Sequence, residues 1–239
     1  MRLPGEWENF LKDTIDFAAF YSQLQLFVTN HSPVLPVKDK IFAVFDYMGP
    51  LDVQCVLFGE DPYPRVKSAC GVAFWDKEIN NWQDKTHGNS LKNILKAIVV
   101  ARGKASYSTK IDEIRIIAER INFKSPPQLF EHWLKQGVLL INTALTFTNP
   151  ALKKEHFEFW QPFHIKLIRA LNQRGKSPFF ILWGGKAAKW EGLIAEFIDD
   201  PVKIIKQGHP TFIHQFMDKN RPHFSPFTEI IEKTGLSWY

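Results

Sequence analysis

The sequence predicts an α/β protein, a three-layer α/β/α sandwich whose centre is a twisted sheet of four parallel strands. Four short apolar runs alternate with segments of helical periodicity, and parallel neighbours in a sheet need such crossover connections. The runs lie at residues 53–58, 138–141, 179–183 and 202–206. They are rich in β-branched and aliphatic residues, which is typical of strands buried on both faces. No boundary interrupts this alternation, so we expect a single domain over residues 1–239.

Two helices are expected before the first strand. The first is an amphipathic helix at the amino terminus that ends at the proline-punctuated stretch 31–36. Its apolar residues recur at helical spacing: Trp7, Phe10, Leu11, Phe17 and Ala18. The second helix, over roughly residues 38–48, brings the chain to the first strand.

Capping residues and prolines predict the helices between the first two strands. Asn89 or Ser90 caps a helix whose apolar side chains share one face. Ser125 and the two prolines after it open a second helix, which Gly137 ends in the usual position. The segment between these helices is expected to form a peripheral loop and a further helix.

Two further helical segments complete the alternation. A long helix near residues 157–173 leads from the second strand to the third, and another helix leads from the third strand to the fourth. Because a helix joins these consecutive strands, we expect all four strands to run in the same direction.

The composition favours an intracellular protein with a polyanionic partner. The 30 basic and 25 acidic residues give a net charge of +5, which suits nucleic acid without requiring it. The two cysteines allow neither a disulfide framework nor a paired-thiol metal motif to be read. Charges near the amino terminus exclude a secretory apolar core, and no apolar segment is long enough to span a bilayer. We therefore expect a soluble, cytoplasmic protein with no membrane partner.

Polar residues and glycines follow the four predicted strands. Asp61 comes after the first strand, Asn142 after the second, Gly184-Gly185 after the third and His209 after the fourth. The carboxyl ends of parallel strands open onto one edge of a sheet, where ligands bind. A carboxylate, an amide, a glycine pair and an imidazole on one rim can activate water, read a polar ring and hold a phosphate.

Each of these residues also has an ordinary structural interpretation. An aspartate before a proline often starts a turn, an asparagine at a strand end can satisfy backbone groups, and a lone histidine is more often structural than catalytic. The dipeptide Gly185-Lys186 lacks the residues that surround it in a phosphate loop. The eight histidines lack metal-ligand spacing, so no metal is expected.

Several ordered motifs resemble those of the family 1 uracil-DNA glycosylases, enzymes that remove uracil from DNA by cutting the base–sugar bond. The motifs are GEDPY at 59–63, GVAF at 71–74, SLKNI at 90–94, LINTALT at 140–146, HPT at 209–211 and RPHFS at 221–225. The similarity begins near residue 35 and covers most of the chain. It implies a monofunctional hydrolase of base excision DNA repair that flips deoxyuridine, hydrolyses the N-glycosidic bond and leaves an abasic site. No cofactor is implied.

The resemblance also assigns roles to the residues of the pocket. Asp61 would position or activate water and stabilise the oxocarbenium-like sugar, and His209 would hydrogen-bond the O2 oxygen of the departing uracil as a neutral donor. Asn142 would read the edge of the uracil ring, because a side-chain amide offers a donor and an acceptor. Phe74 would stack on the flipped base, and Tyr63 would exclude the methyl group of thymine.

DNA contacts are implied for a second group of residues. Ser90, Thr211 and the backbone near Gly185 would contact phosphates, because small residues let the DNA approach and hydroxyls donate to its oxygens. Phe212 or Ile213 would act as the apolar wedge that fills the vacated base stack.

The chain departs from the family pattern near Asp61. Glu60, which we place among the substrate-binding residues, stands where the family usually has glutamine. Neighbours on an extended segment often point apart, so we expect Glu60 to raise the pKa of Asp61 only modestly. Pro64 replaces a common histidine. Residues 65–68 and 153–160 also differ, and we take the second difference, the loss of an Asn-Ser-His sequence, as peripheral.

Uracil-containing DNA is the expected partner of a monomeric enzyme, and the resemblance also allows protein inhibitors that mimic DNA. Two alternatives stay open. The changes at Glu60 and Pro64 are compatible with a glycosylase for another damaged or modified base. The fold could instead serve as a catalytically weak DNA-binding scaffold, although a scaffold needs none of the pocket residues that the chain retains.

Overall fold

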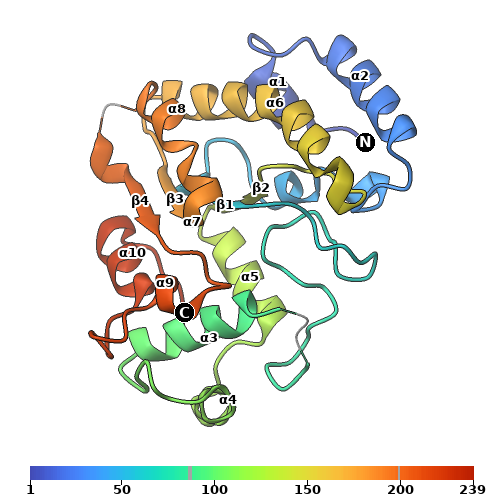
Figure 1. Cartoon of the computed structure of the whole chain (residues 1–239). Helices are drawn as coiled ribbons and strands as arrows, with labels where there is room; N and C mark the ends of the chain where they lie inside the picture. The colour runs from blue at the N-terminus through green and yellow to red at the C-terminus, as the bar shows by residue number, and fades with distance from the viewer. Residues whose placement is uncertain (86–87, 199) are drawn as a thin grey trace.

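Four parallel strands form the centre of the structure, a computed structural model that describes residues 1–85, 88–198 and 200–239. The strands are β1 (Cys55–Gly59), β2 (Val138–Asn142), β3 (Phe179–Trp183) and β4 (Ile204–Gln207). Their order in the sheet is β2-β1-β3-β4, and every neighbouring pair is parallel (Figure 1). The predicted α/β class and its four-stranded parallel sheet are therefore confirmed.

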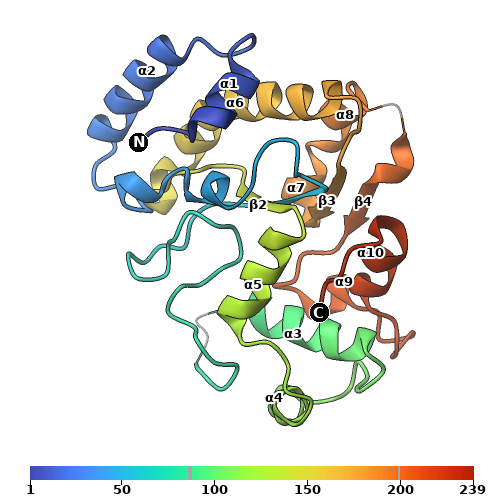
Figure 2. The same ribbon diagram turned by 180° about the vertical axis from the view of Figure 1, so that it is seen from behind.

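Helices cover both faces of this sheet. In Figures 1 and 2, α1, α2, α6 and α8 lie on one side of the strands, and α3, α5 and α10 lie on the other. The helices are α1 (Gly5–Leu11), α2 (Phe17–Asn30), α3 (Ser90–Ala101), α4 (Ile111–Arg120), α5 (Pro126–Lys135), α6 (Lys153–Gln173), α7 (Gly184–Ala188), α8 (Glu191–Ala195), α9 (Ile213–Phe216) and α10 (Pro226–Thr234). β1, β2 and β3 are buried almost throughout, which explains their continuous apolar runs, whereas in the edge strand β4 only Ile205 is buried.

The amino-terminal segment differs from its prediction. The single helix expected there is two helices, because the Asp16 side chain accepts a hydrogen bond from the Ala19 amide and starts α2 as a new helix. The helix expected over residues 38–48 is instead two 3₁₀ turns, Lys38–Lys40 and Ala43–Tyr47. Residues 41–45, which join the first turn to the second and begin the second, are all buried. Tertiary packing on every side therefore determines the backbone conformation there, in place of helix propensity.

The helix α6 begins four residues earlier than the apolar pattern indicates. Its first residue is Lys153, and it follows a 3₁₀ turn, Pro150–Leu152, whose cap is Asn149. The Asn149 side chain accepts hydrogen bonds from the amides of Ala151 and Leu152. This early start brings Lys153 close to the carboxyl end of β1, which matters for the site.

No helix in the part of the chain that the structure describes is long and apolar enough to cross a membrane.

Candidate active site

The ends of β1 and β2 place Asp61 and Asn142 at the same edge of the sheet. Gly59 and Asn142 are paired in the sheet register, and the Thr143 amide donates to the Gly59 carbonyl at 2.9 Å. A side chain at Gly59 would collide with the Asn142 amide oxygen and would lie 2.7 Å from the Ala73 Cβ. The glycine therefore allows the Asn142 side chain to lie across the end of β1.

Tyr63 and Phe74 lie on the loop that follows β1. The Tyr63 hydroxyl donates to the Phe74 carbonyl at 3.2 Å, which fixes the two residues relative to each other. Phe74 has φ +65°, in the left-handed region that a residue with a bulky side chain seldom adopts. Its ring meets the Trp183 ring edge-on at a centroid distance of 5.3 Å. Such backbone strain is retained where the surrounding structure requires it, often at a binding site.

An internal ion-pair network fixes this loop. Arg65 pairs with Asp76 at 2.9 Å and donates to the Ser68 hydroxyl at 3.0 Å, and that hydroxyl donates to Glu78 at 2.7 Å. The Asp76 side chain is almost fully buried. Residues 65–68, which depart from the family pattern, therefore include two, Arg65 and Ser68, that hold the loop carrying Tyr63 and Phe74.

Arg65→Met is expected to lower the free energy of unfolding by about 2–3 kcal/mol, because it leaves the buried Asp76 charge without its partner. The cost is smaller than for a fully buried pair, since the Arg65 side chain is 30% exposed. Urea unfolding measures the change. Arg115→Met is the matched control, because Arg115 pairs with a highly exposed Asp112 and its loss should cost under about 1 kcal/mol. Equal losses in the two variants would contradict the role of Arg65.

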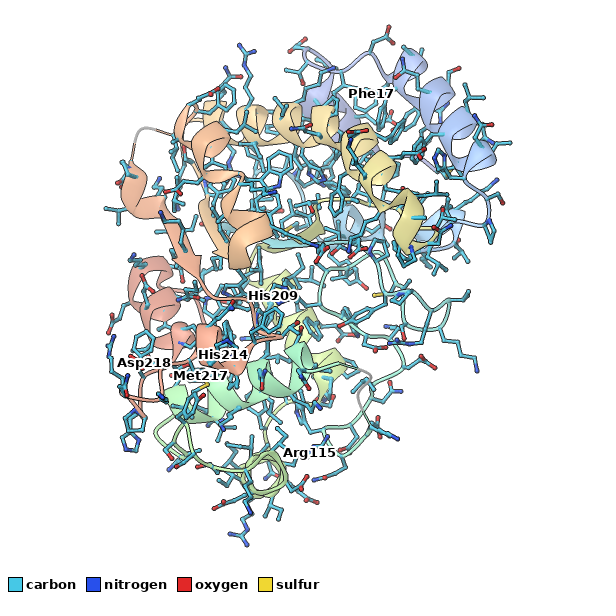
Figure 3. The ribbon with its side chains drawn as sticks, in the orientation of Figure 1. Phe17, Arg115, His209, His214, Met217 and Asp218 are labelled. Atoms are coloured by element: carbon cyan, nitrogen blue, oxygen red, sulfur yellow. The ribbon has the colours of Figure 1, made fainter. Side chains whose placement is uncertain are left out.

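His209 follows β4 and lies near the centre of the molecule (Figure 3). The Thr211 amide donates to His209 Nδ1 at 3.1 Å, so this nitrogen carries no proton and Nε2 carries it. Burial lowers the pKa of His209, with Lys186 acting in the same direction and Glu60 opposing it. The side chain is therefore a neutral imidazole whose free N–H donor is Nε2.

Gly184 lets His209 approach the end of β3. It has φ +85°, and a side chain there would lie 2.6 Å from the His209 Cβ. Of the glycine pair that follows β3, Gly184 thus has a packing role, whereas a side chain at Gly185 would meet nothing within 4 Å.

One pocket of about 180 Å³ brings the predicted base-binding and catalytic residues together. Its lining includes Asp61, Tyr63, Phe74, Asn142 and His209, and also Glu60 and Ser90. The expectation that the carboxyl ends of β1, β2 and β4 converge is confirmed.

A second hollow shares Glu60 and His209 with this pocket and contains most of the predicted DNA contacts. Gly185, Thr211 and Phe212 line it. Ser90 joins the group through its hydroxyl, which lies 2.7 Å from that of Thr211. Ile213 lines neither hollow, and its side chain packs against the hydrophobic core.

The carboxylates of Glu60 and Asp61 share one ammonium group, so the expectation that they point apart is wrong. Lys153 Nζ lies 3.0 Å from Asp61 Oδ2 and also forms an ion pair with Glu60 Oε1. Lys186 forms a second ion pair with Glu60. The Lys153 region, taken as peripheral from its sequence, therefore supplies a charged group to the site. In the sequence, a lysine pair, Lys153-Lys154, stands just before the apolar helical pattern.

These contacts set the charges at the rim of the pocket. Burial raises the pKa of Asp61, and Lys153 offsets part of this effect. Burial would also raise the pKa of Glu60, but hydrogen bonds from Lys153 and Lys186 outweigh it and lower the pKa. Among the described residues, no cluster of three or more histidine, cysteine, aspartate or glutamate side chains is arranged to hold a metal ion.

Curated relatives of this chain are uracil-DNA glycosylases. The enzyme from Streptococcus mutans is 30% identical over 237 residues, which cover 96% of this chain and 94% of the relative. The enzyme from Streptococcus agalactiae serotype III is 28% identical, with 98% and 96% covered. The enzyme from Dictyostelium discoideum is also 28% identical over 97% of this chain, which spans only 61% of that relative's length.

Solved structures show the same fold. A mutant of the UNG from Nitratifractor salsuginis superposes with a TM-score of 0.76 at 24% identity, covering 98% of this chain and 94% of that chain. The mimivirus uracil-DNA glycosylase gives a TM-score of 0.62 at 21% identity, with 87% and 70% covered. The family model described as "Uracil DNA glycosylase superfamily" matches residues 45–232, which include every site residue named above. The chain belongs to the uracil-DNA glycosylase superfamily.

Proposed function

We propose that the protein is a monofunctional uracil-DNA glycosylase of base excision repair, which hydrolyses the N-glycosidic bond of deoxyuridine and releases uracil. The observation that carries this proposal is the convergence of Asp61, Asn142, Phe74 and His209 on one pocket in a chain of this superfamily. The lining offers a carboxylate, an amide, an aromatic face and a neutral imidazole. A pocket beside a sheet edge can accept a base only after that base leaves the DNA stack, so the nucleotide is flipped.

Asn142 and the two aromatic residues select the base. Uracil presents a carbonyl acceptor beside an N–H donor on one edge, and the Asn142 amide matches both groups. Cytosine presents the opposite pattern, so an amide held in the orientation that fits uracil would leave a buried polar group unpaired, which costs about 1–3 kcal/mol. Phe74 stacks on the ring, and Tyr63 occupies the space beside its C5 atom, where thymine carries a methyl group.

Asp61 and His209 act on the bond that breaks. As the C1′–N1 bond lengthens, positive charge develops on the sugar and negative charge on uracil O2. The Asp61 carboxylate stabilises the sugar cation and orients the water whose oxygen bonds to C1′. His209 Nε2–H donates to the O2 anion. The products are uracil and an abasic site, and no cofactor takes part.

The second hollow holds the DNA. Ser90 and Thr211 donate to phosphate oxygens, and the small Gly185 lets the backbone approach. One chain carries all these groups, so the site needs no partner subunit, which fits a monomeric enzyme. A mutant of the mimivirus UNG has been crystallised in complex with UGI. Here, a protein inhibitor that mimics DNA would bind the same rim.

Phe212 is the wedge that fills the vacated stack, because this residue is 51% exposed whereas Ile213 packs on the core. Phe212→Ala is expected to reduce uracil release from duplex DNA by about tenfold and from single-stranded DNA much less, since only the duplex imposes the full cost of unstacking. Single-turnover rates on matched oligonucleotides measure both effects. Ile213→Ala is the comparison variant. A larger duplex-specific loss for Ile213→Ala would assign the wedge to Ile213 instead.

The proposed activity is tested by incubating the folded protein with oligonucleotides that differ in one base. Uracil, hypoxanthine, xanthine and 5-substituted pyrimidines are compared, and the released base is quantified. We expect release of uracil with strong preference over the other bases. Release of a different base in preference to uracil would indicate another glycosylase specificity, and release of none would leave a DNA-binding scaffold.

A further inference from the structure

We infer that Lys153 is a positioning residue for the reaction, which holds the Asp61 carboxylate in its charged form and in a fixed orientation, with Glu60 as the anchor of the lysine. This inference rests on the proposed function and deepens it. It gives a role to two departures from the family pattern, Glu60 and the sequence at the start of α6.

The geometry places Lys153 between the two carboxylates. Lys153 Nζ lies 3.0 Å from Asp61 Oδ2 and forms a hydrogen-bonded ion pair with Glu60 Oε1. The lysine side chain is 29% exposed and that of Asp61 17%, so water screens this pair less than a surface pair. Because α6 begins at Lys153, the helix fixes the position of its backbone beside the end of β1.

Asp61 needs such a partner because of where it lies. Burial favours its neutral form, and a neutral carboxylic acid would neither stabilise a sugar cation nor orient water as strongly as a carboxylate. The charged groups that act on Asp61 are Lys153 on α6, Glu60 on its own turn and Lys186 on α7. Lys153 has the largest charge effect and favours the carboxylate, and Lys186 acts in the same direction. Glu60 opposes them, but its own charge is paired with both lysines.

Lys153 acts through its charge and does not attack the sugar. Burial would lower its pKa, but the hydrogen bonds and charges of Glu60 and Asp61 outweigh burial and raise it. The side chain therefore stays an ammonium group, which has no lone pair for a Schiff base with an abasic sugar. This agrees with hydrolysis that stops at base release, without strand cleavage.

The test compares Lys153→Met with Lys154→Met. Lys154 is the next residue on α6, is 85% exposed, and pairs with Glu158 at 3.5 Å. Removing Lys153 should shift the acid limb of the pH profile of kcat to higher pH. On this limb, kcat of Lys153→Met should be about tenfold lower than that of wild type. At alkaline pH, kcat should approach the wild-type value. Lys154→Met should leave the position of the limb unchanged. Lys153→Arg, which keeps the charge and the donors, should restore it.

Two outcomes would overturn the inference. One is an acid limb in Lys153→Met that stays at the wild-type position. The other is a loss confined to KM, equal at every pH and relieved by low salt, since a lysine that only contacts phosphate would behave in this way.

A measurement without activity separates this inference from the proposed function. ¹³C NMR follows the side-chain carboxyl carbons of labelled aspartates through a pH titration, and Asp61→Asn identifies the Asp61 signal. The pKa of Asp61 should be higher in Lys153→Met than in wild type and Lys154→Met. An unchanged pKa would refute the inference even if uracil is released. A raised pKa would support it even if the protein acts on another base. If Lys153→Met does not fold, Lys153→Gln is titrated in its place.

Discussion

Asp61→Asn is expected to reduce the single-turnover rate of uracil release by about 10³-fold, with DNA affinity changed by no more than a few-fold. The amide keeps the size of the side chain, but it loses the negative charge that stabilises the sugar cation and orients water. Rapid quenching of reactions with a uracil-containing duplex measures the rate. Fluorescence anisotropy with the same DNA measures affinity.

The stability of this variant is a second, independent observable. Burial raises the pKa of Asp61, so the folded state binds the proton more tightly than the unfolded state and loses stability as the pH rises above the ordinary range of an aspartate. Asp61→Asn removes this buried charge, and its unfolding midpoint at pH 7 should be no lower than that of wild type. Asp112→Asn, an exposed aspartate on α4, is the control for both measurements. A loss of activity below about tenfold would remove Asp61 from the catalytic role.

The convergence of the strand ends was predictable because it follows from local signals. Apolar runs mark the four strands, and parallel strands bring their carboxyl ends to one edge. Asp61, Asn142 and His209 each come within three residues of a strand, so their sequence positions largely determine their place in the sheet. Each residue taken alone has an ordinary structural explanation. Their position together at one edge of the sheet favours a functional site more strongly than any one of them does.

The charge network could not be predicted in the same way. The contact of Lys153 with Asp61 depends on where α6 begins relative to the turn after β1, and the apolar pattern becomes visible only near Phe157. The 3₁₀ turn Pro150–Leu152, which Asn149 caps, leads directly into α6 at Lys153, and the apolar pattern does not indicate this turn. Phe212 is likewise exposed because it precedes the first residue of α9, Ile213. A helix of four residues is too short to show an apolar periodicity, so its start could not be predicted.

His209→Ala is expected to lower the rate of uracil release by about 10²–10³-fold, because it removes the donor that stabilises the charge developing on uracil O2. The effect should appear in kcat, since a neutral imidazole hydrogen-bonds the oxygen most strongly after charge has developed. Gly184→Ala tests the same donor indirectly. A methyl group at position 184 displaces His209 without removing it. Gly184→Ala should therefore also lower kcat, as His209→Ala does.

The pH dependence of stability checks that His209 is neutral. Burial lowers its pKa, so the unfolded state binds the proton more tightly, and wild type loses stability as the pH falls through the ordinary range of histidine. The His209→Ala variant lacks this contribution, and its unfolding midpoint should fall less steeply on acidification. His132→Ala on α5, whose ring bonds Ser237 outside the pocket, is the control for activity. A wild type that gains stability relative to His209→Ala on acidification would mean that His209 is a cation, and O2 stabilisation by a neutral donor would then be wrong.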